Sequence, residues 1–130
     1  MRIIRTIGLV AAAVAVHAAQ AGTYTVLQDN DCRLLQAGDI AQAVQQAGKD
    51  TGLQLTKDMA VRAEVQCARD AASKRFVYSI RAAIEKQVND GEVQRWAVIA
   101  HTTSYGTVTG GAPLLREVRF TVQDVIRQEP

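Results

Sequence analysis

Hydrophobic and polar residues alternate over much of the second half of the chain. The clearest run is 76–84, where hydrophobic residues at every second position begin with Phe76 and end with Ile84. A two-residue period is typical of a strand that buries one face. Residues 118–122 show the same period, so we expect a last strand there in preference to a helix that begins at Leu114.

Residues 59–67 combine two conflicting patterns. Hydrophobic residues occupy every second position from Met59 to Cys67, but the content of Ala, Arg, Glu and Gln favours a helix. We interpret the segment as a strand, because a polar turn at 69–74 and the alternating run at 76–84 follow it, as in a hairpin. A helix is the alternative for this segment.

A helical period follows Gly38. Asp39 is placed to cap the first turn, and the pattern stops at the glycines of 48–52. The hydrophobic residues at helical spacing are Ile40, Ala43, Val44 and Ala47. Before this helix, residues 23–27 favour a short strand and the acidic residues of 29–31 favour a turn.

The Asn-Asp-Gly sequence at 89–91 predicts the turn of a β-hairpin. A three-residue loop places Glu85 opposite Arg95, whereas a two-residue loop at 90–91 places Lys86 opposite Arg95. Because like charges directly opposite each other destabilise a sheet, we favour the three-residue loop.

The choice of loop also decides which face of the sheet carries His101. In the favoured register Trp96, Val98 and Ala100 face the core, while Ile99 and His101 face away from it. A slip of one residue exchanges the two faces, so the other register would turn His101 inward.

These segments predict an α+β domain. One helix packs on a four-stranded antiparallel meander, and a short N-terminal strand precedes it. The glycine-rich residues 106–113 are expected to connect the last two strands.

The first 21 residues have the three-part layout of a secretory signal. Arg2 and Arg5 give a positive start, an apolar run extends from Ile7 to Val16, and small residues stand at Ala19 and Ala21. The apolar run is too short for a membrane anchor, which needs about 20 residues. We expect cleavage near Ala21, a single domain over 22–130 and a periplasmic or secreted location.

Export changes the interpretation of the cysteines. Cys32 and Cys67 are the only two in the chain. An even cysteine count in an exported protein predicts one disulfide bond.

Export also changes the charge of the working protein. Without Arg2 and Arg5 the chain has thirteen basic and thirteen acidic residues, because the full sequence has 15 and 13. A formally neutral domain without a basic stripe excludes nucleic acid as the expected partner. After residue 21 the only histidine is His101, and there is no C-x-x-C pair, so we expect no metal and no cofactor.

The sequence contains no recognisable catalytic motif, so binding is the leading hypothesis. The outer face of the predicted sheet carries hydrophobic residues among cationic ones, a composition that suits a protein partner. Its residues are Val77, Arg81, Arg95, Ile99, His101 and Arg119. We expect a non-enzymatic domain that acts on a protein or on a component of the cell envelope.

Two other functions stay open. An inhibitor or immunity protein would block a secreted enzyme, and Thr102 to Pro113 would be its natural probe. A small hydrolase or isomerase would use His101, with Ser79, Ser104 or Ser73 as the neighbouring hydroxyl. The oligomeric state does not follow from the sequence.

Overall fold

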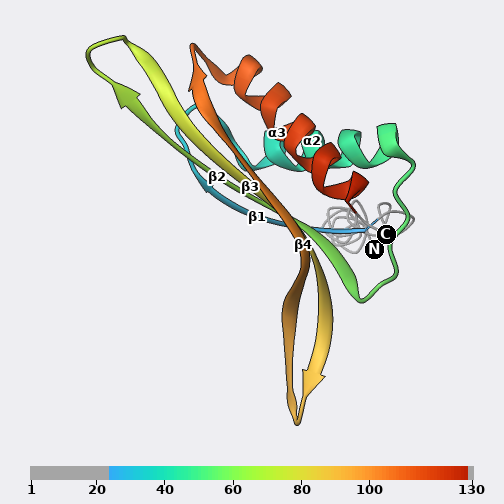
Figure 1. Cartoon of the computed structure of the whole chain (residues 1–130). Helices are drawn as coiled ribbons and strands as arrows, with labels where there is room; N and C mark the ends of the chain where they lie inside the picture. The colour runs from blue at the N-terminus through green and yellow to red at the C-terminus, as the bar shows by residue number, and fades with distance from the viewer. Residues whose placement is uncertain (1–23, 129–130) are drawn as a thin grey trace, which may run out of the picture.

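The sheet has four strands and a mixed topology. The computed structural model describes residues 24–128. β1 (Thr25–Asp31), β2 (Met59–Asp70), β3 (Arg75–Asp90) and β4 (Val93–Val108) lie side by side in chain order (Figure 1). β2, β3 and β4 are antiparallel, as predicted, but β1 is parallel to β2. The α+β class is confirmed, whereas the purely antiparallel sheet is wrong, because a helix crossover joins β1 to β2.

Two helices, α2 (Ala37–Thr51) and α3 (Gly111–Arg127), cover one face of this sheet (Figure 1). α2 confirms the predicted helix. Asp39 does not begin it, but its Oδ2 accepts a hydrogen bond from the backbone N–H of Gln36 at 3.1 Å. α2 ends at Gly52, whose φ of 70° is a conformation that glycine adopts without steric cost.

α3 replaces the predicted strand at 118–122, which is a correction to the sequence analysis. Val118 and Val122 are both buried, and they are four residues apart, on one side of the helix. Phe120 lies between them in sequence and is exposed on the other side. The short alternation was therefore a fragment of a helical stripe that continues through Leu114 and Val125.

The core lies between the helices and one face of the sheet. Its largest fully buried side chains come from both layers. They are Ile40 and Val44 of α2, Leu114, Val118, Val122 and Val125 of α3, and Val61, Val65, Ile80 and Ile84 of the sheet. We call the opposite side of the sheet the outer face.

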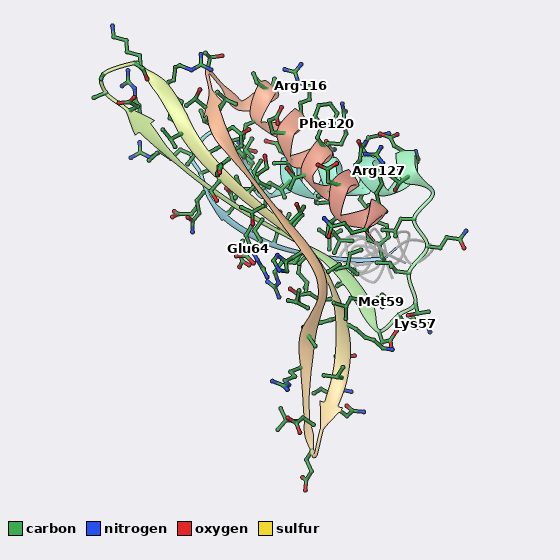
Figure 2. The ribbon with its side chains drawn as sticks, in the orientation of Figure 1. Lys57, Met59, Glu64, Arg116, Phe120 and Arg127 are labelled. Carbon is green, nitrogen blue, oxygen red and sulfur yellow. A yellow bond between two sulfur atoms is a disulfide. The ribbon has the colours of Figure 1, made fainter. Side chains whose placement is uncertain are left out.

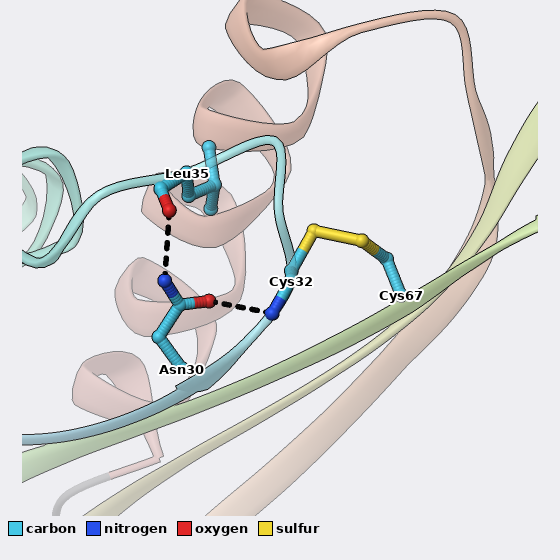
Figure 3. The surroundings of a disulfide bond; sticks show 4 residues. All are labelled: Asn30, Cys32, Leu35 and Cys67. Carbon is cyan, nitrogen blue, oxygen red and sulfur yellow. Dashed lines mark hydrogen bonds between the residues drawn. A yellow bond between two sulfur atoms is a disulfide. The ribbon is translucent and has the colours of Figure 1, made fainter.

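The predicted disulfide bond joins Cys32 to Cys67, with their Cα atoms 4.9 Å apart (Figure 3). The Asn30 side chain holds the loop that follows β1. Its Oδ1 accepts from the Cys32 N–H at 3.0 Å, and its Nδ2 donates to the Leu35 carbonyl at 2.9 Å (Figure 3). The bond therefore ties the start of the helix crossover to the distal part of β2.

The predicted export signal, residues 1–21, lies outside the described residues. Neither α2 nor α3 has the length and apolar character of a membrane-spanning helix.

Candidate functional site

The β3–β4 hairpin has a register that neither predicted loop gives. Asp90 pairs with Val93, so Gly91 and Glu92 form the turn, and Gly91 has a φ of 70°. Both predicted registers are therefore wrong. The like-charge argument does not decide between them, because Arg95 pairs with Val88 and its guanidinium lies 3.5 Å from the Asp90 carboxylate.

A β-bulge at Ile99 changes the register once more. Glu85 pairs with Val98, but the preceding residue, Ile84, pairs with Ala100. The extra residue puts Val98 and His101 on the outer face, although a regular strand would send them to opposite faces. Of the two predictions that depended on the hairpin, His101 on the outer face is right and Val98 in the core is wrong.

Charged side chains on the outer face form pairs between strands. Arg62 of β2 donates from Nε to Glu85 Oε2 at 2.7 Å and from a terminal nitrogen to Asp29 Oδ2 at 2.9 Å. The Glu85 side chain is 5 % exposed. Its hydrogen bond is the main cause that raises the pKa of Arg62 above its usual range. This buried pair fixes the junction of β1, β2 and β3.

A second ion pair lies further along the same face. Arg81 of β3 donates to Glu64 Oε2 at 2.9 Å, across a directly paired position. Figure 2 shows Glu64 on the side of the sheet away from the helices. The sequence analysis did not find the Arg62–Glu85 pair, because its members are 23 residues apart and register alone brings them together.

The structure divides the predicted binding face. Val77 and Arg81 lie on the outer face with His101, as the register of β3 and β4 requires. Ile99 lies on the bulge beside them. Arg95 and Arg119 do not belong to this face. Arg95 lies near the hairpin tip, and Arg119 lies on α3, because the segment that carries it is a helix.

Exposed hydrophobic side chains gather on β4 and its neighbour. Among residues 24–128, six large hydrophobic side chains are exposed, and four of them belong to β4. Three of the residues on β4 and one on β3 lie along the sheet, and we call this group the β4 surface. Its residues are Val77, Val98, Ile99 and Tyr105. Tyr105 is 77 % exposed. Tyr105 was not among the predicted binding residues, because it lies in the expected probe loop 102–113, which instead forms the end of β4 and the start of α3.

The β4 surface has two ends. Val77 pairs with Thr107 and lies diagonal to Tyr105, whereas Val98 and Ile99 lie at the bulge. At about 3.3 Å per residue the two groups are about 20 Å apart along the strand. Polar residues, from His101 to Ser104, lie between them. This spacing matches an extended partner segment better than a compact ligand.

The hairpin tip projects beyond the sheet (Figure 1). The pairing of β2 with β3 begins at Met59 and Lys86, so residues 87–97, which we call the arm, have no third strand beside them. The arm carries Val88, Val93 and Trp96, and Val93 is exposed. A two-stranded ribbon is marginally stable alone, and hydrophobic residues on such a ribbon are commonly covered by a partner.

β4 is also an edge strand, because it pairs with β3 on one side only. Natural edge strands are usually protected by charged residues or proline. Residues 100–108 contain neither Lys, Arg, Asp, Glu nor Pro, whereas the other edge strand, β1, contains two aspartate residues, Asp29 and Asp31. The β4 edge is the one that another strand can join.

His101 lies far from Ser79, one of the hydroxyl groups expected to act with it. It pairs with Ala83, and in the described part of the chain its ring has no hydrogen-bond partner. Ser79 lies four residues from Ala83 on β3, which is about 13 Å along the strand. That distance is too long for a nucleophile and its base.

No protein-family model matches this chain, and no curated protein matches it.

Proposed function

We propose that this chain is an exported, non-enzymatic domain that binds an extended segment of a protein partner at β4. The observation that carries the proposal is the concentration of exposed hydrophobic side chains on β4. Tyr105 and Ile99 provide contact area at the two ends of the β4 surface. Large hydrophobic and aromatic residues supply most of the binding energy in protein interfaces.

The free edge of β4 gives this binding a physical route. A partner strand that aligns with residues 100–106 would gain main-chain hydrogen bonds from the free edge, whereas the Thr107 carbonyl already accepts from Arg75 at 3.2 Å. Its side chains would alternate between the outer face, near Val77 and Tyr105, and the helix side. The bulge at Ile99 limits pairing to this segment, because a bulge interrupts the ladder.

Export is supported by two independent features. Residues 1–21 have the pattern of a cleavable signal, and Cys32 and Cys67 form a disulfide bond. Disulfide bonds persist in oxidising compartments such as the periplasm and the extracellular space. The domain would therefore meet its partner outside the cytoplasm. The partner would be a free protein or a protein of the cell envelope.

A second candidate function is inhibition of a secreted enzyme. The arm supports it, because a narrow projecting hairpin with Val93 near its tip has the shape to enter a cleft (Figure 1). The segment 102–113, which was expected to be the probe loop, is not a loop, because it consists of the end of β4 and the start of α3. Nothing around His101 supports the hydrolase or isomerase.

Site-directed photocrosslinking in the cells that produce the protein tests the proposal. Benzoylphenylalanine would replace Tyr105 and, in separate variants, Val93 and Phe120. Phe120 is the matched control, because it is hydrophobic and 43 % exposed but lies on α3. We expect one adduct from position 105 and none from position 120.

Three other outcomes would decide against parts of the proposal. An adduct from position 93 alone favours the arm and the inhibitor function. An adduct from position 120 alone, or an unchanged amount of adduct when Ile99→Asp is added to the position 105 variant, contradicts binding at β4.

A further inference from the structure

An open groove of about 1010 Å³ runs between the exposed sides of α2 and α3. It lies on the helix layer, so it is separate from the β4 surface. Figure 2 shows Arg116 and Phe120 projecting from α3 on this side of the molecule. The lining includes Gln45 and Lys49 of α2 and Leu115, Arg116 and Arg119 of α3.

Two buried donors in this groove have no acceptor. The Nε2 of Gln45 and the Nε of Arg119 are both buried, and neither has a hydrogen-bond partner among the described residues. Nearly all buried polar groups in proteins are hydrogen-bonded, so such a pair indicates a missing partner. Neither atom is exposed in the free protein, so a ligand with acceptor oxygens would satisfy a donor from each helix once both side chains turn toward the groove.

The charge of the groove indicates an anion. Lys49, Arg116 and Arg119 all line it, and none forms an ion pair within residues 24–128. Asp39 is the one acidic residue of the lining, and its carboxylate already accepts from Gln36. The Arg119 guanidinium lies 5.5 Å from the centre of the Phe120 ring, which restricts its orientation.

The rest of the lining indicates an apolar chain. Ala43, Leu53 and Leu115 are half-buried and pack against the core, so their remaining surface forms an apolar floor. The lining residues on α2 extend from Asp39 to Lys49, which is about 15 Å at 1.5 Å per residue. An apolar floor with cationic groups above it suits an elongated amphiphile with an anionic head.

We propose that the groove between α2 and α3 binds an amphiphilic anion, a single alkyl chain with a carboxylate or phosphate head. Arg119 and Gln45 donate to the head, and Lys49 and Arg116 add positive charge around it. Leu53 and Leu115 contact the chain. A free fatty acid and a single-chain phospholipid both offer this chemistry.

Isothermal titration of the mature protein with ligands of one chain length tests this inference. The ligands are myristate, tetradecyl phosphate and tetradecyl maltoside, each kept below its micelle concentration, with acetate and inorganic phosphate as heads without a chain. We expect binding of at least one anionic amphiphile and about tenfold weaker binding of the maltoside, because its head leaves the cationic donors unpaired. Tighter binding of myristate would indicate a fatty acid as the natural ligand, and tighter binding of tetradecyl phosphate would indicate a single-chain phospholipid.

Variants assign the binding to the groove. Arg119→Met keeps the length of the side chain and removes the donors. It should weaken binding of the anion about tenfold and leave the affinity for the maltoside unchanged. Arg95→Met, on the arm, is the matched control and should have no effect. Gln45→Met gives a second test if Arg119→Met lowers the melting temperature.

Any one of three results would overturn the inference. The protein could bind the maltoside as tightly as the anions, both variants could bind the anions as tightly as the wild type, or no amphiphile could bind. None of these results bears on the β4 surface, because the two sites share no residue.

Discussion

The Nε of Arg62 lies 2.7 Å from a carboxylate oxygen of Glu85, on the face of the sheet that no helix covers. Glu85 is nevertheless almost fully buried, and Arg62 is its partner. Arg62→Gln would leave a buried carboxylate without a counter-ion, so we expect a loss of about 3 kcal/mol in the free energy of unfolding. Urea denaturation followed by circular dichroism measures this change.

The matched control for Arg62 is Arg127→Gln. Arg127 also pairs with an aspartate, Asp124, at 3.6 Å, but both side chains are exposed. Its loss should cost less than about 0.5 kcal/mol. Replacement of both Arg62 and Glu85 by leucine should recover most of the stability, because no buried charge is then unpaired. Equal effects of the two single variants would contradict this account.

Gly48 and Tyr24 explain why α2 contains a glycine in its interior. The Tyr24 hydroxyl donates to the Val44 carbonyl at 2.9 Å, and a Cβ at position 48 would lie 1.8 Å from that hydroxyl oxygen. Alanine is about 1 kcal/mol better than glycine in a helix. We expect Gly48→Ala to destabilise the protein by at least about 1 kcal/mol all the same, because Tyr24 must move.

Gly38 provides the comparison within the same helix. No atom lies within 4 Å of a Cβ at position 38. Gly38→Ala should be neutral or stabilising by up to about 1 kcal/mol in thermal unfolding. The cost of Gly48→Ala should largely disappear in a Tyr24→Ala background, and a cost that persists there would show that another contact is responsible.

Burial raises the pKa of Tyr24 to about 12, with a smaller opposing effect from a backbone hydrogen bond. The unfolded chain releases this proton near pH 10. Between pH 10 and 12 the folded state therefore binds more protons than the unfolded state, and stability falls as the pH rises. Tyr24→Phe should lose less stability than the wild type over this interval in urea titrations. Parallel curves would contradict the burial of an un-ionised Tyr24.

The disulfide bond closes a loop of 35 residues. On the chain-entropy estimate, its removal in Cys32→Ser/Cys67→Ser should cost about 4 kcal/mol of stability. Mass spectrometry of the secreted protein should show a gain of two hydrogen atoms on reduction under denaturing conditions. An unchanged mass would mean that the thiols are free in the natural compartment.

The sequence predicts those elements whose patterns are long. The nine-residue alternation that starts at Phe76 fixes β3, and the stripe from Ile40 to Ala47 fixes α2. The run at 118–122 is too short to distinguish a period of two from positions four apart, so a strand was favoured over the helix that begins at Leu114. Arg119 was therefore expected on the outer face of the sheet, whereas it belongs to the helix layer.

The candidate site is less predictable, because it depends on register. The position of His101 relative to Val98 depends on one extra residue at Ile99, and no local pattern marks that bulge. Likewise, the partner of Arg62 lies on another strand. Val77 and Arg81 were placed correctly because both belong to the strand with the clearest alternation.

The arm allows a last test, because Trp96 is the only tryptophan of the chain. Residues 87–97 have no third strand beside them, so their backbone hydrogen bonds open without disruption of the core. In hydrogen exchange of the isolated protein, their amides should lose protection well before those of 77–84. Acrylamide should quench Trp96 in the free protein, and quenching should decrease when a partner covers the arm. If residues 87–97 were as well protected as the central strands, the arm would already be covered, as in a self-associated form. Fast exchange should then return when the same experiment is repeated on a dilution series.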